Sequence, residues 1–189
     1  MQVKKAAVKD AILAAAFKLF AANGYADTPI TAIARAAGVS QANLYVYFDS
    51  KIEILFALYE PWFRKRIATM ERAIAAAPTQ RARLVILLKT LWRGLPAANA
   101  GFSVNLMQAI SVEGRTTGYD PATLQWVESR IAAILAENLP PTRAKRLANA
   151  RVAHVLMMAL DGFTINYRLN PSRRCTDPLA ETFADLLLG

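Results

Sequence analysis

A glycine between two short helical patterns most constrains how this chain folds. Gly38 follows residues 29–37, in which apolar residues recur every three to four positions, and Ser40 precedes a second such segment over 41–48. Glycine adopts the left-handed backbone that ends a helix, and serine caps the helix that follows. Alanines just before the glycine allow two helices to cross closely. This stretch therefore predicts a helix-turn-helix.

The remainder of the 189-residue chain also has helical spacing, with abundant alanine and no alternating strand pattern or repeat. Besides the two helices of the motif, helices are expected at about 3–23, from Lys51 onward, and at 79–94, 103–113, 121–138, 141–170 and 177–188. Loops are expected over 95–101, 114–120 and 171–176, and Pro61 predicts a kink or break near 57–61. The predicted fold is all-α, with a three-helix helix-turn-helix domain over residues 1–50 and a larger helical domain over 51–189.

Composition bounds the class of protein. Apolar residues make up 54% of the chain and charged residues 20%, which is enough for a substantial core. No apolar run approaches the ~18–20 residues of a membrane span, and no secretion signal is visible at the start. The single cysteine, Cys175, excludes an internal disulfide and suits a cytoplasmic location. The net charge of +9 indicates either plain solubility or attraction to a polyanion such as DNA.

Enzymatic chemistry has little support in the sequence. The chain has one histidine and one cysteine, with no spacing typical of a nucleophile and its base. It has no glycine-lysine phosphate loop, no dinucleotide-binding glycine pattern and no Cys/His cluster for a metal. We therefore expect neither an enzyme nor a bound cofactor or metal.

The second helix of the motif has side chains that suit DNA recognition. With Leu44 packed inward, the residues expected to face outward, at least in part, are Gln41, Asn43, Tyr45 and Tyr47. Glutamine and asparagine bond base edges, adenine above all, and tyrosine hydroxyls bond phosphates. Lys51, at the start of the next helix, is placed to attract a phosphate. The alternative is an ordinary helical hairpin whose two tyrosines are core aromatics.

These segments resemble the TetR/AcrR family of bacterial transcriptional regulators over about residues 8–58. The resemblance rests on Thr28-Pro29 at a helix start, Gly38 at the turn, the run Leu44-Tyr45-Val46-Tyr47-Phe48, and Lys51. It implies a homodimer, usually a repressor, that binds a roughly palindromic operator in double-stranded DNA. A small molecule bound by the C-terminal domain would release the DNA.

The resemblance also assigns roles to single residues. It places Gln41, Ala42 and Asn43 against bases, and it places against the DNA backbone Thr28, Thr31, Tyr45, Tyr47 and Lys51. Thr31 stands where the family often has a basic residue, and Val46 where it often has histidine. Both departures put phosphate contacts or the choice of operator in doubt.

The last two helices are the candidates for a dimer interface, since two-fold dimers place two recognition helices about 34–36 Å apart. Their stripes include Val155, Ala159, Gly162, Phe163, Leu179, Phe183 and Leu186. The alternative is that these stripes pack within one subunit.

The second domain also has residues suited to an effector pocket, for which we expect a hydrophobic or aromatic ligand. The candidates are Trp62, Phe63, Trp92, Phe102, Met107, Trp126, His154 and Met158. Such residues at helical spacing are more often plain core, and a lone histidine is more often a core residue than a ligand contact. Asn105, Gln108 and Asp161 have the same ambiguity. A further alternative for the whole chain is a helical module of the same fold that binds small molecules or proteins without reading DNA.

Overall fold

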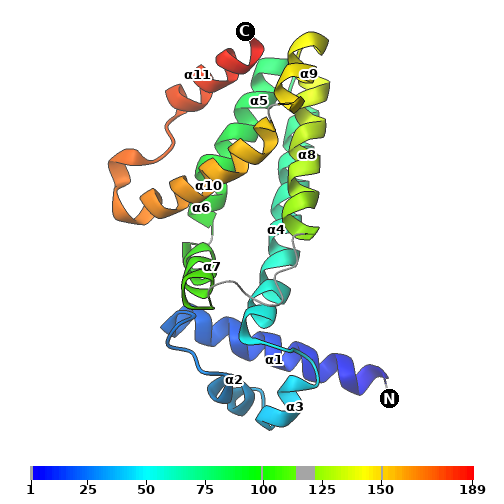
Figure 1. The fold of residues 1–189 in the computed structure, drawn as a ribbon, viewed down its shortest axis with the longest axis vertical. Coiled ribbons are helices and arrows are strands. Elements are labelled where there is room, and N and C mark those ends of the chain that lie inside the picture. Colours follow the sequence, from blue (N-terminus) through cyan, green and yellow to red (C-terminus); the bar gives the residue numbers. More distant parts are fainter. Residues whose placement is uncertain (1, 99, 114–121, 150) are drawn as a thin grey trace. The chain divides into compact units, whose positions relative to one another are not determined.

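The computed structural model describes residues 2–98, 100–113, 122–149 and 151–189, which form helices joined by turns and loops, with no strand among them (Figure 1). The all-α prediction is confirmed. By backbone contact the chain divides into two compact units, drawn from Met1–Phe63 with Gly101–Asp120 (unit 1) and from Arg64–Ala100 with Pro121–Gly189 (unit 2). Unit 1 thus extends beyond residue 50 and takes in a distant helix. The predicted functional boundary at residues 50 and 51 stays a prediction.

Unit 1 contains α1 (Gln2–Asn23), α2 (Ile30–Ala36), α3 (Gln41–Tyr45), the first part of α4 (Lys51–Ala76) and most of α7 (Ala100–Glu113). The two short helices α2 and α3 are neighbours below α1 in Figure 1. One apolar core unites these elements, and its buried members include Ile12, Ala16, Phe20, Ile33, Leu44, Phe48, Ile52, Leu55 and Ala109. Since Ala109 lies on α7, the core is completed by residues far along the chain.

The start of α4 is fixed by side chains of its own first turn. The Ser50 hydroxyl accepts a hydrogen bond from the Glu53 amide at 3.2 Å, and the Glu53 carboxylate accepts one from the Asp49 amide at 2.6 Å. This reciprocal pattern satisfies amides that the helix itself leaves unpaired. From there α4 runs as one helix through Pro61, so of the kink or break predicted near residues 57–61 the break is wrong, and the kink stays a prediction.

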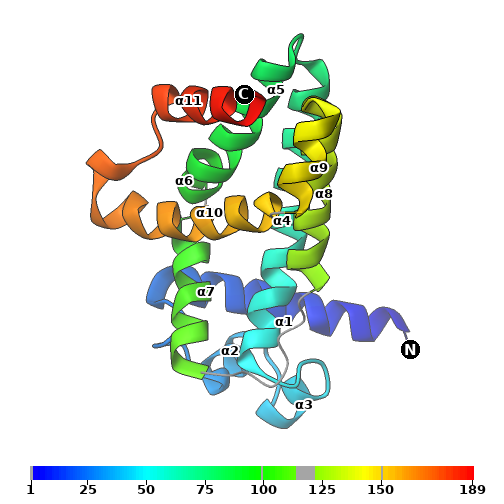
Figure 2. The ribbon, with the colours of Figure 1, turned by 45° about the horizontal axis from the view of Figure 1, so that its top comes forward.

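Unit 2 contains the rest of α4, then α5 (Gln80–Lys89), a π-helical turn η1 (Thr90–Gly94), α6 (Leu95–Ala98), α8 (Ala122–Asn138), α9 (Pro141–Asn149), α10 (Val152–Leu169), the 3₁₀ turn η2 (Pro171–Arg173) and α11 (Asp177–Leu188). Figures 1 and 2 both show α11 beside α5, and α9 beside α8. Trp92 lies at the centre of this unit. Its indole N–H donates to the Leu156 carbonyl at 3.1 Å, and its ring stacks on Phe163 and meets Phe183 edge-on.

Ion pairs hold α11 against α5. Arg81 bonds the Asp185 carboxylate at 2.7 Å, while Asp177 pairs with Lys89 at 3.1 Å and also with Arg93. Hydrogen bonds from Lys89 and Arg93 lower the pKa of Asp177, and a hydrogen bond from Arg81 lowers the pKa of Asp185. Exposed pairs contribute little to stability. Their effect here is to fix the orientation of α11 on its own chain.

Two predicted boundaries are wrong. The loop predicted over 95–101 is helical where described, because the wide turn η1 leads directly into α6 and Pro96 lies in its first turn, where a missing N–H is tolerated. The single helix predicted over 141–170 is two helices, since Arg151 has a left-handed φ of 52° at the start of α10. The loop predicted over 114–120 lies outside the described residues.

Across the described ranges, no helix is long and apolar enough to cross a membrane.

Candidate nucleic-acid interface

The turn between α2 and α3 is built by Gly38. Its φ is +70°, and its amide donates to Arg35 while the amide of Val39 donates to the Ala34 carbonyl at 3.0 Å. This pair of bonds closes the end of α2 in the Schellman pattern, which requires a left-handed residue at the glycine position. A β-carbon on Gly38 would meet nothing within 4 Å, so the glycine is needed for its backbone conformation and not for space.

Helix α3 is short and is held at two points. The Ser40 hydroxyl accepts a hydrogen bond from the Asn43 amide at 3.1 Å, which caps the helix start as predicted. Leu44 is fully buried in the unit 1 core. With this face anchored, Gln41, Ala42 and Asn43 are exposed along the helix start. The side chains that suit base edges are therefore free to meet a groove.

The two tyrosines differ in their surroundings. Tyr45 is 44% exposed, and Tyr47 is half-buried and packs against the unit 1 core. Thr31, on α2, is exposed, and Val46 is the most exposed apolar residue of this segment at 68%. Most of the residues that the sequence predicts to face outward thus lie on the surface.

Thr28 has a different role from the one predicted. Its side chain is fully buried, and its hydroxyl donates to the Gly24 carbonyl at 2.7 Å and approaches the Leu19 carbonyl at 3.4 Å. It does not cap α2, whose N-cap is Pro29 without a side-chain bond. The Thr28 side chain instead stabilises the turn after α1, which leaves it unsuited to a phosphate contact.

Lys51 is also tied into the protein. Its ammonium donates to the Tyr25 carbonyl at 2.8 Å and to the Thr28 carbonyl at 3.2 Å, and it lies 4.1 Å from the centre of the Tyr25 ring. These contacts join the start of α4 to the turn that precedes α2. The phosphate contact predicted for Lys51 stays a prediction, beside this structural role.

Comparisons with known proteins agree with this geometry. Residues 12–58 match the family model described as bacterial regulatory proteins, tetR family. This segment belongs to the tetR family. It includes α2, the turn at Gly38 and α3, which are the elements that expose Gln41 and Asn43.

Curated relatives of this tetR-family segment are regulators. A fatty acid metabolism regulator protein of Bacillus subtilis (strain 168) is 32% identical over 77 residues, which cover 41% of this chain and 40% of the relative. An uncharacterized HTH-type transcriptional regulator of Xanthobacter autotrophicus is 25% identical over 98% of this chain and 91% of its own length. The chain therefore spans about two fifths of the first relative and nearly all of the second.

Solved structures extend the likeness to the whole fold. The fatty acid degradation regulator FadR of Bacillus halodurans has a TM-score of 0.66 at 21% identity, over 96% of this chain and 95% of that one. FadR of Bacillus subtilis, solved in complex with stearoyl-CoA, has a TM-score of 0.57 at 20% identity, over 95% and 97%. At these identities the likeness concerns the fold alone.

The residues proposed for an effector pocket are distributed over both units, and their role there stays a prediction. Phe63 and Trp92 are buried core residues of different units, Met158 is exposed on α10, and the side chain of Phe102 lies outside the described residues. The remaining half-buried members are Trp62, Met107 and Trp126, of which Trp126 packs under the Arg64 guanidinium. Spacing alone cannot separate core from pocket in an apolar helix.

His154 and Asp161 lie on the exposed side of α10. The His154 side chain is exposed and pairs through Nδ1 with the Glu128 carboxylate at 2.6 Å, so the interior position considered for it is wrong. Partial desolvation raises the pKa of the Asp161 carboxyl. In the parts of the chain described, no group of three or more His, Cys, Asp or Glu residues could hold a metal.

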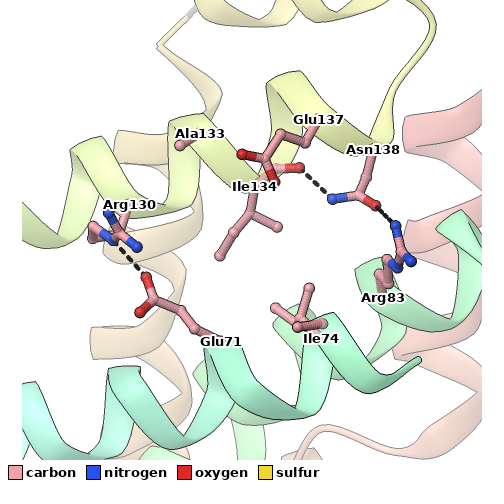
Figure 3. A pocket seen from close by; sticks show the side chains of 9 residues that line it. Glu71, Ile74, Arg83, Arg130, Ala133, Ile134, Glu137 and Asn138 are labelled. Atoms are coloured by element: carbon pink, nitrogen blue, oxygen red, sulfur yellow. Dashed lines mark hydrogen bonds and ion pairs between the residues drawn. The ribbon is translucent and has the colours of Figure 1, made fainter.

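Unit 2 has a pocket of about 230 Å³ between α4, α5 and α8 (Figure 3). Glu71 pairs with Arg130 across it at 2.5 Å, and Arg83 approaches the Asn138 amide oxygen at 3.5 Å. None of the predicted effector residues lines it. Its lining also includes the charged Glu137, and drug-sized ligands usually occupy about 300–1,000 Å³. This pocket is therefore too small and too polar for a long apolar ligand in its present form.

Exposed apolar residues lie on both α10 and α11, and we call these residues together the α10–α11 face. Its exposed members are Val155, Met158, Ile165, Leu169, Phe183 and Leu186. Gly162 lies among them with no atom within 4 Å of a would-be β-carbon. Of the other predicted interface residues, Ala159 and Leu179 are half-buried, whereas Phe163 stacks on Trp92 inside unit 2.

The role of Lys51 can be tested by Lys51→Met, which keeps the aliphatic stem and removes the ammonium. We expect the free energy of unfolding to fall by about 1.5–3 kcal/mol, because two carbonyls lose a charged donor. Urea unfolding followed by circular dichroism measures this. Lys65→Met, at an exposed lysine of the same helix, is the matched control and should change little. Equal stability of the two variants would contradict the structural role of Lys51.

Proposed function

We propose that this protein is a non-catalytic, DNA-binding transcriptional repressor that acts in the cytoplasm. It binds a roughly palindromic operator as a homodimer and leaves it when a small molecule binds. The observation that carries the proposal is the exposure of Gln41 and Asn43 on a helix anchored by buried Leu44, within a tetR-family segment. Amide side chains on the first turn of a recognition helix suit the edges of bases in the major groove.

Contacts to the DNA backbone complete the proposed interface. Tyr45, Tyr47 and the exposed Thr31 hydroxyl flank the base-reading residues and are suited to phosphate or sugar. The net charge of +9 favours association with DNA in general. We therefore expect affinity to depend strongly on salt and specificity to depend on the two amides.

Selection of bound duplexes from a random pool at low salt tests DNA reading. We expect a two-fold operator and an affinity that falls steeply between low and moderate salt. Asn43→Ala should relax preference at one position of each half-site by about 1–3 kcal/mol. Gln80→Ala, at an exposed glutamine of unit 2, should leave the profile unchanged. No enrichment of any duplex at low salt would reject the proposal.

The α10–α11 face supports a homodimer. Large exposed apolar patches on a soluble protein often mark a site of association with another protein. Val155, Met158 and Leu186 are exposed on helices whose opposite sides pack in the unit 2 core. Because ion pairs hold α11 on α5 of the same chain, its exposed apolar residues are available to a second copy.

Val155→Glu and Leu186→Glu test this face. Each residue is exposed in the subunit, so the fold should be retained, while a charge in the contact should weaken dimerisation at least about tenfold. Sedimentation equilibrium measures the dimer constant, and circular dichroism checks helicity. Ile110→Glu, at an exposed apolar residue of unit 1, is the control. Dimers of unchanged stability would place the interface elsewhere.

For the effector we propose a molecule with a long apolar chain. Similar proteins are named for fatty acid metabolism or degradation, and FadR of Bacillus subtilis was solved with stearoyl-CoA. The abundance of large apolar residues in unit 2, Trp92 and Trp126 among them, suits such a ligand. The 230 Å³ pocket is too small for an acyl chain in its present form, so a ligand bound there would require the helices that line it to separate.

Fluorescence anisotropy of the selected duplex tests the effector. Stearoyl-CoA should raise the apparent Kd for DNA by about 5- to 150-fold, the usual range of coupling between two sites. Coenzyme A without the acyl chain should have no effect. If neither long-chain acyl-CoA nor free stearate changes DNA binding, the apolar-chain proposal is wrong, and DNA reading is unaffected by that result.

A further inference from the structure

One face of α7 is directed into unit 1. Ala109 is fully buried in its core, Leu106 packs against that core, and Asn105 is only 4% exposed. Asn105 and Gln108, one helical turn apart, bear the polar groups of this face. Their partners are backbone atoms at the end of α1 and just beyond it.

The contacts of Gln108 are with the turn that connects α1 to α2. Its side-chain carbonyl accepts hydrogen bonds from the Tyr25 amide at 3.0 Å and from the Ala26 amide at 3.4 Å. Beside it, the Asn105 amide donates to the Phe20 carbonyl at 3.2 Å. Tyr25 is buried, and a buried backbone N–H without a partner is costly, so the bond to Gln108 stabilises the turn.

Gly24 allows this close approach. Its φ is +81°, and a β-carbon there would lie 3.0 Å from the Gln108 side-chain oxygen. The glycine therefore serves both the left-handed end of α1 and the space that Gln108 needs. Two residues separated by more than eighty positions are thus fitted to each other.

The same turn is held from its other side by Lys51 and Thr28. Lys51 donates to the carbonyls of Tyr25 and Thr28, and the Thr28 hydroxyl donates to the Gly24 carbonyl. Two amides of the turn, those of Tyr25 and Ala26, are thus bonded by α7, and three of its carbonyls are bonded by α4 and by the Thr28 hydroxyl. Pro29 and α2 follow at once, so the turn sets where the helix-turn-helix begins.

We propose that Gln108 is a positioning residue for DNA reading, which acts by holding residues 24–28 and through them α2 and α3. This inference rests on the proposed function. It adds to the DNA-reading unit a residue that lies well beyond the tetR-family segment of residues 12–58. Gln108 touches no base or phosphate in this role, and its effect on DNA is through the geometry of the turn.

Three full-length variants test the proposal. Gln108→Leu keeps the volume and removes the acceptor, Gln108→Glu keeps an acceptor oxygen, and Gln125→Leu at an exposed glutamine of α8 is the matched control. In Gln108→Leu, hydrogen exchange at the Tyr25 and Ala26 amides should quicken roughly two- to tenfold, as for one lost hydrogen bond. The Kd for the selected duplex should rise by a similar factor. Gln108→Glu and Gln125→Leu should match the wild type in both measurements.

The outcomes separate this inference from the proposed function. If hydrogen exchange at the Tyr25 amide is unchanged in Gln108→Leu, Gln108 does not stabilise the turn. If exchange is faster but the Kd for the selected duplex is unchanged, Gln108 has no role in DNA reading. If Gln108→Leu does not fold, Gln108→Glu decides: loss of protection at Tyr25 or of DNA affinity in this variant contradicts the proposal. If the wild-type chain binds no duplex, the proposed function is wrong, and the positioning role is wrong with it. The exchange experiment would then still show whether Gln108 stabilises the turn.

Discussion

The burial of Leu44 is the contact on which the presentation of α3 depends. Isolated helices shorter than about 12–15 residues are marginal in water, and α3 has five residues. Its position must therefore come from its surroundings, which are the core around Leu44, the Ser40 cap and the left-handed turn at Gly38. The positions of the exposed Gln41 and Asn43 side chains therefore depend on these three supports.

That core is assembled from distant parts of the chain. Ile12 of α1, Ile33 of α2 and Leu55 of α4 meet Ala109 of α7 in one cluster. A small unit with short helices buries little apolar surface by itself, so an added helix matters more than it would in a larger domain. The polar contacts of α7 with the end of α1 also join distant parts of the chain. Gln108 and Asn105 bond backbone groups of Tyr25 and Phe20 at the end of α1 and just beyond it.

The features that could be predicted from sequence act over a few residues. Gly38 and Ser40 determine structure through neighbours within one or two helical turns, and the inward side of Leu44 and the all-α class follow from helical spacing. Thr28 was misread because a threonine before proline is typical of a helix cap, whereas its hydroxyl bonds the preceding turn. The partner of Gln108 is 83 positions away, and nothing in local spacing indicates it. Trp92 and His154 were both candidates for the effector pocket, yet Trp92 is a core residue and His154 is exposed. Helical spacing does not distinguish core, pocket and surface residues.

Helix α10 connects the interior of unit 2 to its apolar outer face. Leu156 accepts the Trp92 indole bond and Phe163 stacks on the same ring, while Val155 and Met158 face outward on the same helix. Neighbouring residues of a helix are about 100° apart around its axis, so a modest rotation would move inward and outward residues together. Packed interiors do not deform smoothly and change by discrete repacking. A ligand that displaced the Trp92 cluster by rotating α10 would therefore also move the exposed residues of the α10–α11 face.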